Sequence, residues 1–165
     1  MDIITRTFED DGYIPNNPFY PVILYKGALA GRESETEMVF NENGWLNSWT
    51  NGVFNYHHYH SNTHEVLGVV SGTAVLKLGG ENGEEVAVEA GDVVLLPAGT
   101  GHKRISASPD FKVTGAYPDG ADYDTKTGQT LERPQVMENI KHTGIPENDP
   151  VLGKNGPVHE YWNTR

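Results

Sequence analysis

Residues 53–117 hold a series of short β-forming segments, and this series restricts the possible folds more than any other feature. The segments are VFNYHHYH, EVLGVV, TAVLKL, EVAV, DVVLL, HKRISA and FKVTGAY. Turn-forming residues separate them, among them SNT, SG, GGENGE, EAG and PAGTG. Strands of this length at this spacing are typical of an antiparallel sandwich or barrel. The sequence therefore predicts an all-β core over about residues 50–117.

The segments on either side of this core differ from it in composition. Residues 1–49 contain one strand candidate, PVILYKGAL, and one short helix candidate over residues 33–40, where Ser34 and Glu37 have the spacing of a capping box. Residues 118–165 are polar, with five prolines and five glycines, so we expect an irregular arm. No repeat or linker divides the 165 residues. We therefore expect a single domain, 1–165, with an N-terminal extension and a C-terminal arm.

Charge and composition argue against several kinds of partner. The 23 Asp and Glu residues outnumber the 12 Lys and Arg residues, which gives a formal charge of −11. An acidic surface repels phosphate backbones and anionic lipid, so we expect no nucleic acid and no membrane as a partner. Apolar runs such as VVLLPA are far shorter than the roughly 20 residues of a membrane span. The start, MDIITRTFEDDG, does not resemble a secretory signal, and we expect a cytoplasmic protein.

One stretch at the start of the core is rich in histidine. YHHYHSNTHE, residues 56–65, holds four of the seven histidines, and the chain has no cysteine to offer as a metal ligand. On a strand, His58 and His60 share a face with roughly 6–7 Å between their Cβ atoms, so both rings can bind one metal ion. His57 then points to the opposite face.

The direction of Glu65 follows from the next two segments. If Ser71 and Gly72 form a two-residue hairpin loop, residues at every second position share one face of the sheet. That face holds Glu65, Leu67, Val69, Ala74, Leu76 and Leu78. Five of the six are apolar, so this is the core face and Glu65 is buried, while His64 points the other way; a bulge at the loop would reverse both. A buried carboxylate needs a hydrogen bond, an ion pair or a metal.

Other polar residues are weaker candidates for the site. His102 follows the strand end and turn LLPAGTG, and it can supply a fourth ligand if it lies across the sheet from Glu65. Arg104 has the same parity as His102 and can bind a carboxylate if it points inward. His142 and His159 lie in the polar arm, where we expect contact with solvent unless the arm folds over the barrel mouth.

Two spaced motifs resemble those of the cupin superfamily. The first, G-x5-H-x-H-x4-E-x6-G, is present as Gly52, His58, His60, Glu65 and Gly72. The second, G-x5-P-x-G-x2-H-x3-N, is present as Gly91, Pro97, Gly99 and His102, with Ser106 in place of the Asn. The last position is not a metal ligand in the family, so the change does not affect the expected site.

The resemblance implies a double-stranded β-helix, or jelly roll, that often forms a homodimer. It also implies one divalent metal held by His58, His60, Glu65 and His102 near a barrel mouth. It does not imply one reaction, because cupins include dioxygenases, isomerases, epimerases, decarboxylases, storage proteins and sugar-binding regulators. Unpaired strand edges and long polar ends independently favour a dimer.

The proposed ligand set indicates the kind of chemistry. Three imidazoles and one carboxylate suit Fe, Mn, Ni, Co or Zn. An octahedral ion would keep about two open positions for water, dioxygen or a ligand oxygen. We therefore predict a metal-dependent enzyme of the dioxygenase or isomerase type, acting on a small polar or anionic molecule. Its general base is unknown, with Tyr56, His57 and His64 as candidates by proximity only.

Two alternatives remain to be separated from this prediction. One is a small-molecule-binding or metal-sensing module without turnover, and the other is a structural metal site in an interaction protein. A structural ion is fully coordinated by the protein, whereas a catalytic ion keeps an open position. Conversion of a metabolite would distinguish the enzyme from the binding module.

Overall fold

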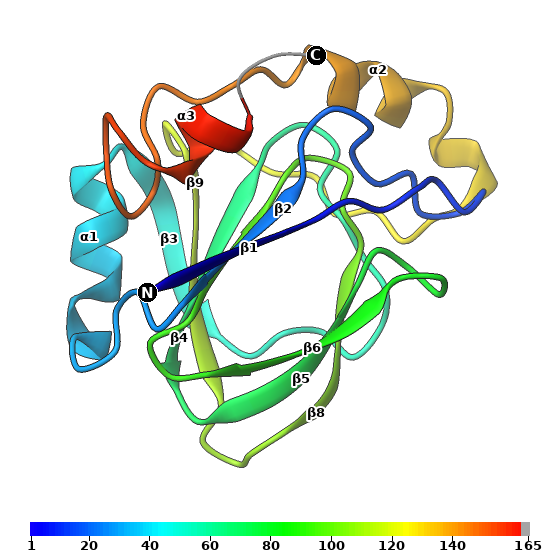
Figure 1. The fold of residues 1–165 in the computed structure, drawn as a ribbon. Coiled ribbons are helices and arrows are strands. Elements are labelled where there is room, and N and C mark those ends of the chain that lie inside the picture. The colour runs from blue at the N-terminus through cyan, green and yellow to red at the C-terminus, as the bar shows by residue number, and fades with distance from the viewer. Residues whose placement is uncertain (163–165) are drawn as a thin grey trace.

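The computed structural model, which describes residues 1–162, contains two antiparallel sheets. The larger sheet has six strands in the order β1-β2-β7-β4-β9-β3, and the smaller has three in the order β6-β5-β8 (Figure 1). The strands are Asp2–Arg6 (β1), Val22–Lys26 (β2), Trp45–Asn51 (β3), Glu65–Ser71 (β4), Thr73–Leu78 (β5), Glu84–Glu89 (β6), Val93–Leu96 (β7), His102–Ala107 (β8) and Lys112–Pro118 (β9). The predicted all-β double-stranded β-helix is confirmed.

The inward faces of the two sheets form an apolar core. Because side chains alternate along a strand, each strand contributes every second residue to it. The core residues include Leu67, Val69, Ala74, Leu76, Leu78, Val86, Val88, Val94, Leu96 and Val113. The five apolar residues predicted to share a face with Glu65 are all among them.

The predicted hairpin around Gly72 is wrong. β4 pairs with β7 and β9, whereas β5 pairs with β6 and β8, so the two strands belong to different sheets. Gly72, with φ of +74°, turns the chain from the larger sheet into the smaller one. Since the two sheets face each other, the inward sides of β4 and β5 still meet in one core. The predicted side for Glu65 is therefore correct although the predicted pairing is not.

The outer face of the larger sheet is covered rather than solvated. Helix α1, Thr36–Glu42, lies against it and places Phe40 next to Val66 in a second apolar cluster. A Cβ on Gly68 would come within 2.4 Å of Thr36 Cγ2, so this glycine allows the helix to approach β4 closely. The predicted helix near residues 33–40 is confirmed, preceded by a 3-10 turn over Glu33–Glu35. The capping box is not formed, because neither N-cap makes a side-chain hydrogen bond.

The segments outside the predicted core contain more regular structure than expected. β1, β2 and β3 come from residues 1–51 and complete the larger sheet. The arm holds a 3-10 turn, Thr130–Glu132, and helices α2, Gln135–His142, and α3, Pro157–Tyr161. Figure 1 shows both helices at the top of the barrel. No helix within residues 1–162 is long and apolar enough to cross a membrane.

The predicted strand VFNYHHYH is mostly absent. Only two isolated bridges form there, His58 with His102 and Tyr59 with Lys126. The segment is therefore an extended connection, which isolated backbone hydrogen bonds at Phe54, His58, Tyr59 and His60 hold in place.

Candidate metal centre

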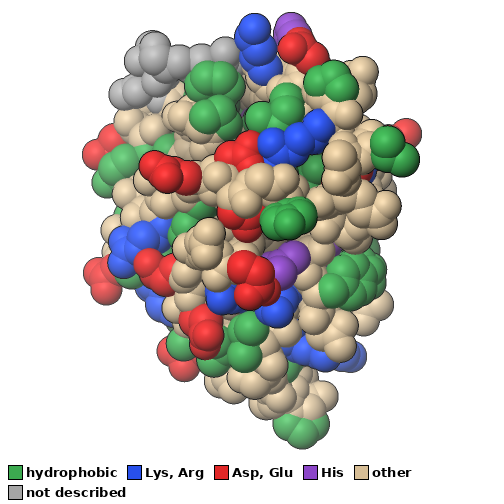
Figure 2. All heavy atoms as spheres, turned by 90° about the vertical axis from the view of Figure 1, so that its right-hand side faces the viewer, with side chains coloured by type: hydrophobic (Ala, Val, Ile, Leu, Met, Phe, Trp, Pro, Cys, Tyr) green, Lys and Arg blue, Asp and Glu red, His purple; other side chains and the backbone are tan. Residues whose placement is uncertain are grey.

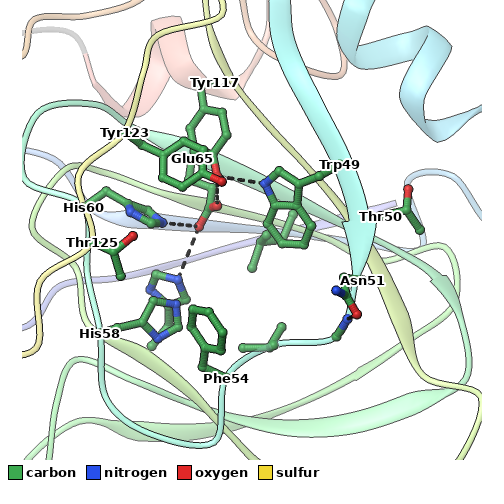
Figure 3. Close-up of a pocket in the computed structure, with 14 residues that line it drawn as sticks. Trp49, Thr50, Asn51, Phe54, His58, His60, Glu65, Tyr117, Tyr123 and Thr125 are labelled. Atoms are coloured by element: carbon green, nitrogen blue, oxygen red, sulfur yellow. Dashed lines mark hydrogen bonds and ion pairs between the residues drawn. The ribbon is translucent and has the colours of Figure 1, made fainter.

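A cavity of about 400 Å³ opens between the two sheets. Its lining comes from several elements, with Trp49, Thr50 and Asn51 on β3 and Tyr117 on β9. All four predicted ligands line it as well, namely His58, His60, Glu65 and His102. Figure 3 shows Glu65 between His60, Tyr117 and Trp49, with His58 and Phe54 on the lower wall. The structure thus brings together four residues that the sequence places up to 44 positions apart, from residue 58 to residue 102.

Backbone hydrogen bonds set the positions of the histidines. His58 and His102 bond reciprocally, with N···O distances of 3.2 Å and 2.9 Å, so the connection is fixed to the start of β8. The His60 carbonyl accepts from Gly99 N at 2.7 Å. Glu65 is the first residue of β4 and is 2 % exposed.

Each histidine ring uses its Nδ1 to contact a backbone carbonyl. Nδ1 lies 3.1 Å from Tyr56 O in His58, 2.5 Å from Asp124 O in His60 and 3.1 Å from Thr100 O in His102. A carbonyl only accepts hydrogen bonds, so these contacts place the proton on Nδ1 and leave the Nε2 lone pair free. Neutral imidazoles held in this way are typical metal ligands.

The free nitrogens converge on the Glu65 carboxylate. Glu65 Oε1 lies 3.3 Å from His60 Nε2 and 3.2 Å from His102 Nε2. One ring nitrogen from each of His58, His60 and His102 lies within 4.8 Å of the other two. Within the described residues, Glu65 Oε1 and His102 Nε2 are buried without a partner in hydrogen-bonding geometry. Buried acceptors that face one another fit a shared cation, because otherwise their desolvation would be uncompensated.

The electrostatics of the cluster agree with this arrangement. Burial lowers the pKa of His58 to about 3, with a further contribution from His102, so the ring is neutral. Burial alone would raise the pKa of Glu65, but His60 and His102 hold it well below its ordinary value. Glu65 in turn raises the pKa of His60 against the effect of burial. The carboxylate is thus ionised and favours a positive charge beside it.

A hydrogen-bond chain fixes the second oxygen of Glu65. Tyr117 Oη donates to Glu65 Oε2 at 2.7 Å and accepts from Trp49 Nε1 at 2.8 Å (Figure 3). Burial, followed by the charge of Glu65, raises the pKa of Tyr117, so its hydroxyl stays protonated. Oε2 is therefore engaged, and Oε1 is the oxygen that faces the histidines. The sequence carried no signal for Trp49 or Tyr117 in this role.

Residues 122–126, which we call the strap, form another part of the site that sequence reasoning missed. The Asp124 carboxylate accepts hydrogen bonds from Ser61 N at 2.6 Å and from Ser61 Oγ, while its carbonyl accepts from His60. Asn62 adds contacts to Asp122 O and Asp124 N. Tyr123 stacks on Tyr117 with 4.3 Å between ring centroids. The strap thus orients His60, one of the proposed metal ligands, and forms one wall of the cavity.

The other two histidines of the cluster are directed elsewhere. His57 Nε2 lies 2.6 Å from Glu81 Oε1 at the surface. His64 is buried, where its Nδ1 accepts from Ala98 N and its Nε2 contacts Gly144 O. Burial lowers the pKa of His64 to about 4, so it is a neutral core histidine rather than a ligand.

The remaining candidates do not reach the cavity. The lining identified among residues 1–162 excludes Tyr56, His57 and His64, so none of the three suggested bases faces it. Arg104 lines a separate shallow hollow next to Gly52, which argues against its suggested role in binding the carboxylate of a molecule in the cavity. His142 and His159 contact backbone carbonyls of the arm instead: Glu138 O and Glu147 O.

The face shown in Figure 2 has Lys and Arg side chains scattered among acidic ones, without a basic patch.

Comparisons with known proteins give one close relative. The uncharacterized protein YjlB from Bacillus subtilis (strain 168) is 49% identical over 158 residues, which cover 96% of this chain and 95% of the relative. A family profile described as "Cupin domain" matches residues 49–113. These residues include all four predicted ligands.

Two solved structures show weaker similarity. A DUF861 family protein from Thermotoga maritima is 21% identical, covering 57% of this chain and 96% of its own, with a TM-score of 0.37. A protein with a double-stranded β-helix domain from Klebsiella pneumoniae is 16% identical, covering 75% of this chain and 93% of its own, with a TM-score of 0.40. Both similarities are too low to support an inference about function.

Proposed function

This chain belongs to the cupin superfamily, as a relative of YjlB, and we propose that it is a metal-dependent enzyme acting on a small molecule in the barrel cavity. The proposed ligands are Nε2 of His58, His60 and His102 together with Oε1 of Glu65. One observation carries the proposal: these acceptor atoms face one another in a buried site, and two of them lack any other partner among the described residues.

The donor set suits Fe, Mn, Ni, Co or Zn. Such an ion supplies Lewis-acid chemistry or a binding position for dioxygen or a substrate oxygen. The protein's own contribution is to hold the rings and the carboxylate. Carbonyl acceptors on Nδ1 fix the ring orientation and direct each Nε2 into the site, and Tyr117 holds Glu65 with Oε1 toward the histidines.

Of the two reaction types, oxygenation by dioxygen is better supported than isomerisation. An isomerase needs a side chain that moves a proton on the substrate. Besides the four proposed ligands, the titratable side chains on the described lining are Tyr117 and Tyr123. Tyr117 already donates to Glu65, so Tyr123 is the single titratable side chain on the described lining that is left to move a proton.

The same observation supports an alternative, a cupin that binds a small molecule without converting it. Both functions need the metal and the cavity, and they differ in turnover. The experiment is to load the full chain with each of the five metals and to follow oxygen consumption with candidate metabolites. Consumption that is lost in Glu65→Gln and kept in His57→Ala supports the enzyme; binding of a metabolite without consumption or conversion supports the alternative.

We also propose that the chain forms a homodimer. Within residues 1–162 the larger sheet ends in β1 and β3 and the smaller in β6 and β8. The edge of β8 is partly paired, through backbone hydrogen bonds to Phe54 and His58, whereas the other three edges have no strand beside them in the described chain. Exposed edges favour pairing with another chain. Light scattering should give the mass of a dimer, and the mass of a monomer would refute this part of the proposal.

A further inference from the structure

We propose that the cavity selects an uncharged molecule that carries an oxygen donor and a flat face, and that it discriminates against molecules with several negative charges. This inference rests on the proposed metal centre, since the metal would bind the oxygen. It follows from the charge, the ring array and the unpaired polar groups of the cavity wall.

The charge of the wall is the first observation. Among the described lining residues there is no Lys or Arg, and the carboxylate of Glu65 is buried within the wall. Phosphates and dicarboxylates are usually bound by guanidinium or ammonium groups. Here the metal would be the sole strong positive charge, and the carboxylate of Glu65 would already reduce the net charge of the site from +2 to about +1. A second anionic group would have no counter-charge.

Basic residues near the mouth do not compensate for this lack. Arg104 lines a neighbouring hollow, and Lys103 Nζ lies 3.9 Å from Glu81 at the surface. Asp124 adds an acidic group behind His60, where it bonds to Ser61. With a net charge of −11 over the chain, the surrounding field disfavours an incoming polyanion.

Aromatic rings form much of the wall. Tyr123 stacks on Tyr117 with an interplanar angle of 20°, and Tyr117 accepts a hydrogen bond from Trp49, so the three rings are mutually fixed. A Cβ on Gly115 would come within 2.4 Å of Trp49 Cζ2, so a glycine is needed beneath the indole. Phe54 lies at the opposite wall (Figure 3), and its ring stacks on Tyr56. Preset ring faces favour a flat or ring-shaped ligand.

The polar groups left on the wall are uncharged. Trp49 Nε1 and Thr50 Oγ1 already bond to Tyr117 and Thr114. Within the described chain, the Asn51 amide nitrogen and the hydroxyls of Tyr123 and Thr125 have no side-chain hydrogen bond to another residue. These groups can bond to hydroxyl or carbonyl oxygens of a ligand. The volume of about 400 Å³ lies near the small end of ligand sites, about 300–1,000 Å³, which favours a compound with one ring.

The test compares three probes by calorimetry on metal-loaded full chain. Benzamide is flat and uncharged and offers one carbonyl oxygen, phthalate has the same ring with two carboxylates, and erythritol is uncharged without a flat face. We expect benzamide to bind about tenfold more tightly than either of the others. Phthalate binding as tightly as benzamide would overturn the charge argument, and erythritol binding as tightly would overturn the ring argument. No binding of any probe would overturn the inference as a whole.

Two variants sharpen the test. Asn51→Arg adds a cation at the wall and should raise phthalate affinity about tenfold while changing benzamide affinity little. Phe54→Ala removes a ring face and should weaken benzamide binding about tenfold without loss of metal. An unchanged phthalate affinity in the first variant, or an unchanged benzamide affinity in the second, would contradict the inference.

Metal content is measured on every sample, which separates this inference from the proposed function. Protein that binds no metal refutes the proposed function and this inference together. Metal-loaded protein that prefers phthalate refutes only the choice of ligand.

Discussion

Tyr117 Oη and Glu65 Oε2 are joined by a buried hydrogen bond of 2.7 Å, which connects β9 to the first residue of β4. The tyrosine is held by Trp49 Nε1 at 2.8 Å. This bond decides which carboxylate oxygen faces the three histidines.

Tyr117→Phe removes that hydroxyl but keeps the aromatic ring in the cavity wall. We expect the affinity for a divalent ion to fall about 10- to 100-fold, as is typical when a group that orients a ligand is lost. The free energy of unfolding should fall by about 1–3 kcal/mol, because Trp49 Nε1 and Glu65 Oε2 lose their partner. Competition with a chelator and denaturant unfolding measure the two effects.

Tyr123→Phe is the matched control for this variant. Its hydroxyl has no hydrogen-bond partner in the described chain, while its ring also lines the cavity. We expect its metal affinity to equal that of the wild type. Equal losses in Tyr117→Phe and Tyr123→Phe would mean that the hydroxyl of Tyr117 does not act through Glu65.

Asp124→Ala tests whether the strap orients His60. The carboxylate holds Ser61, and its loss should loosen the carbonyl that accepts from His60 Nδ1. We expect metal affinity to fall about tenfold, measured by chelator competition. Asp122→Ala is the control, because Asp122 contacts Asn62 through its backbone carbonyl. A fall in the control as large as that in Asp124→Ala would count against a specific role of the carboxylate.

His64→Leu separates a structural histidine from a ligand. The substitution leaves Ala98 N and Gly144 O without their partners, so we expect the free energy of unfolding to fall by about 1–3 kcal/mol. Metal content per folded chain should stay at the wild-type level. His60→Ala should show the reverse, with strongly reduced metal content, and loss of metal in His64→Leu equal to that in His60→Ala would contradict the assignment.

Gly115→Ala tests the packing of the indole on β9. The new Cβ would lie within 2.4 Å of the Trp49 ring, so the indole must shift, which disturbs its hydrogen bond to Tyr117. We expect a change in tryptophan fluorescence together with weaker benzamide binding, by about tenfold. Gly144→Ala, where a Cβ meets nothing within 4 Å, is the control and should leave both unchanged. A wild-type spectrum in Gly115→Ala would contradict the close packing.

The inward direction of Glu65 could be predicted because it depends on a local rule. Alternation along β4 decides which side chains share a face, whatever strand lies beside it. The strands that pair with β4 are decided instead by contacts distant in sequence. A glycine such as Gly72, with φ of +74°, is compatible both with a hairpin and with a turn that leads into another sheet, so the residue type did not distinguish the two. The sequence therefore predicted the face correctly and the pairing wrongly.

The residues that support the site could not be predicted for the same reason. Trp49, Tyr117 and Asp124 lie outside the two spaced motifs, and no pattern around them points to the histidines. The segment around His58 and Tyr59 is rich in residues that favour strands, but each of these two residues has only one bridge partner. Strand propensity favours an extended backbone, whereas a regular strand also needs a neighbouring strand along its whole length.

Helix α2 was missed because its pattern is short. Val136 and Ile140 are buried at a spacing of four residues, which is about one turn of a helix. A single pair of apolar residues at this spacing is too weak a pattern to predict a helix in a polar segment. Its position becomes understandable only in the fold, where Ile140 packs close to Gly99 in the turn before His102.

Metal content tests the central claim most directly. The full chain should be purified without a metal-affinity column and analysed by mass spectrometry of the elements, beside Glu65→Ala and His60→Ala. We predict about one divalent transition-metal ion per wild-type chain and strongly reduced content in both variants. A wild-type chain that holds no such ion, even after reconstitution with Fe, Mn, Ni, Co and Zn, would contradict the account.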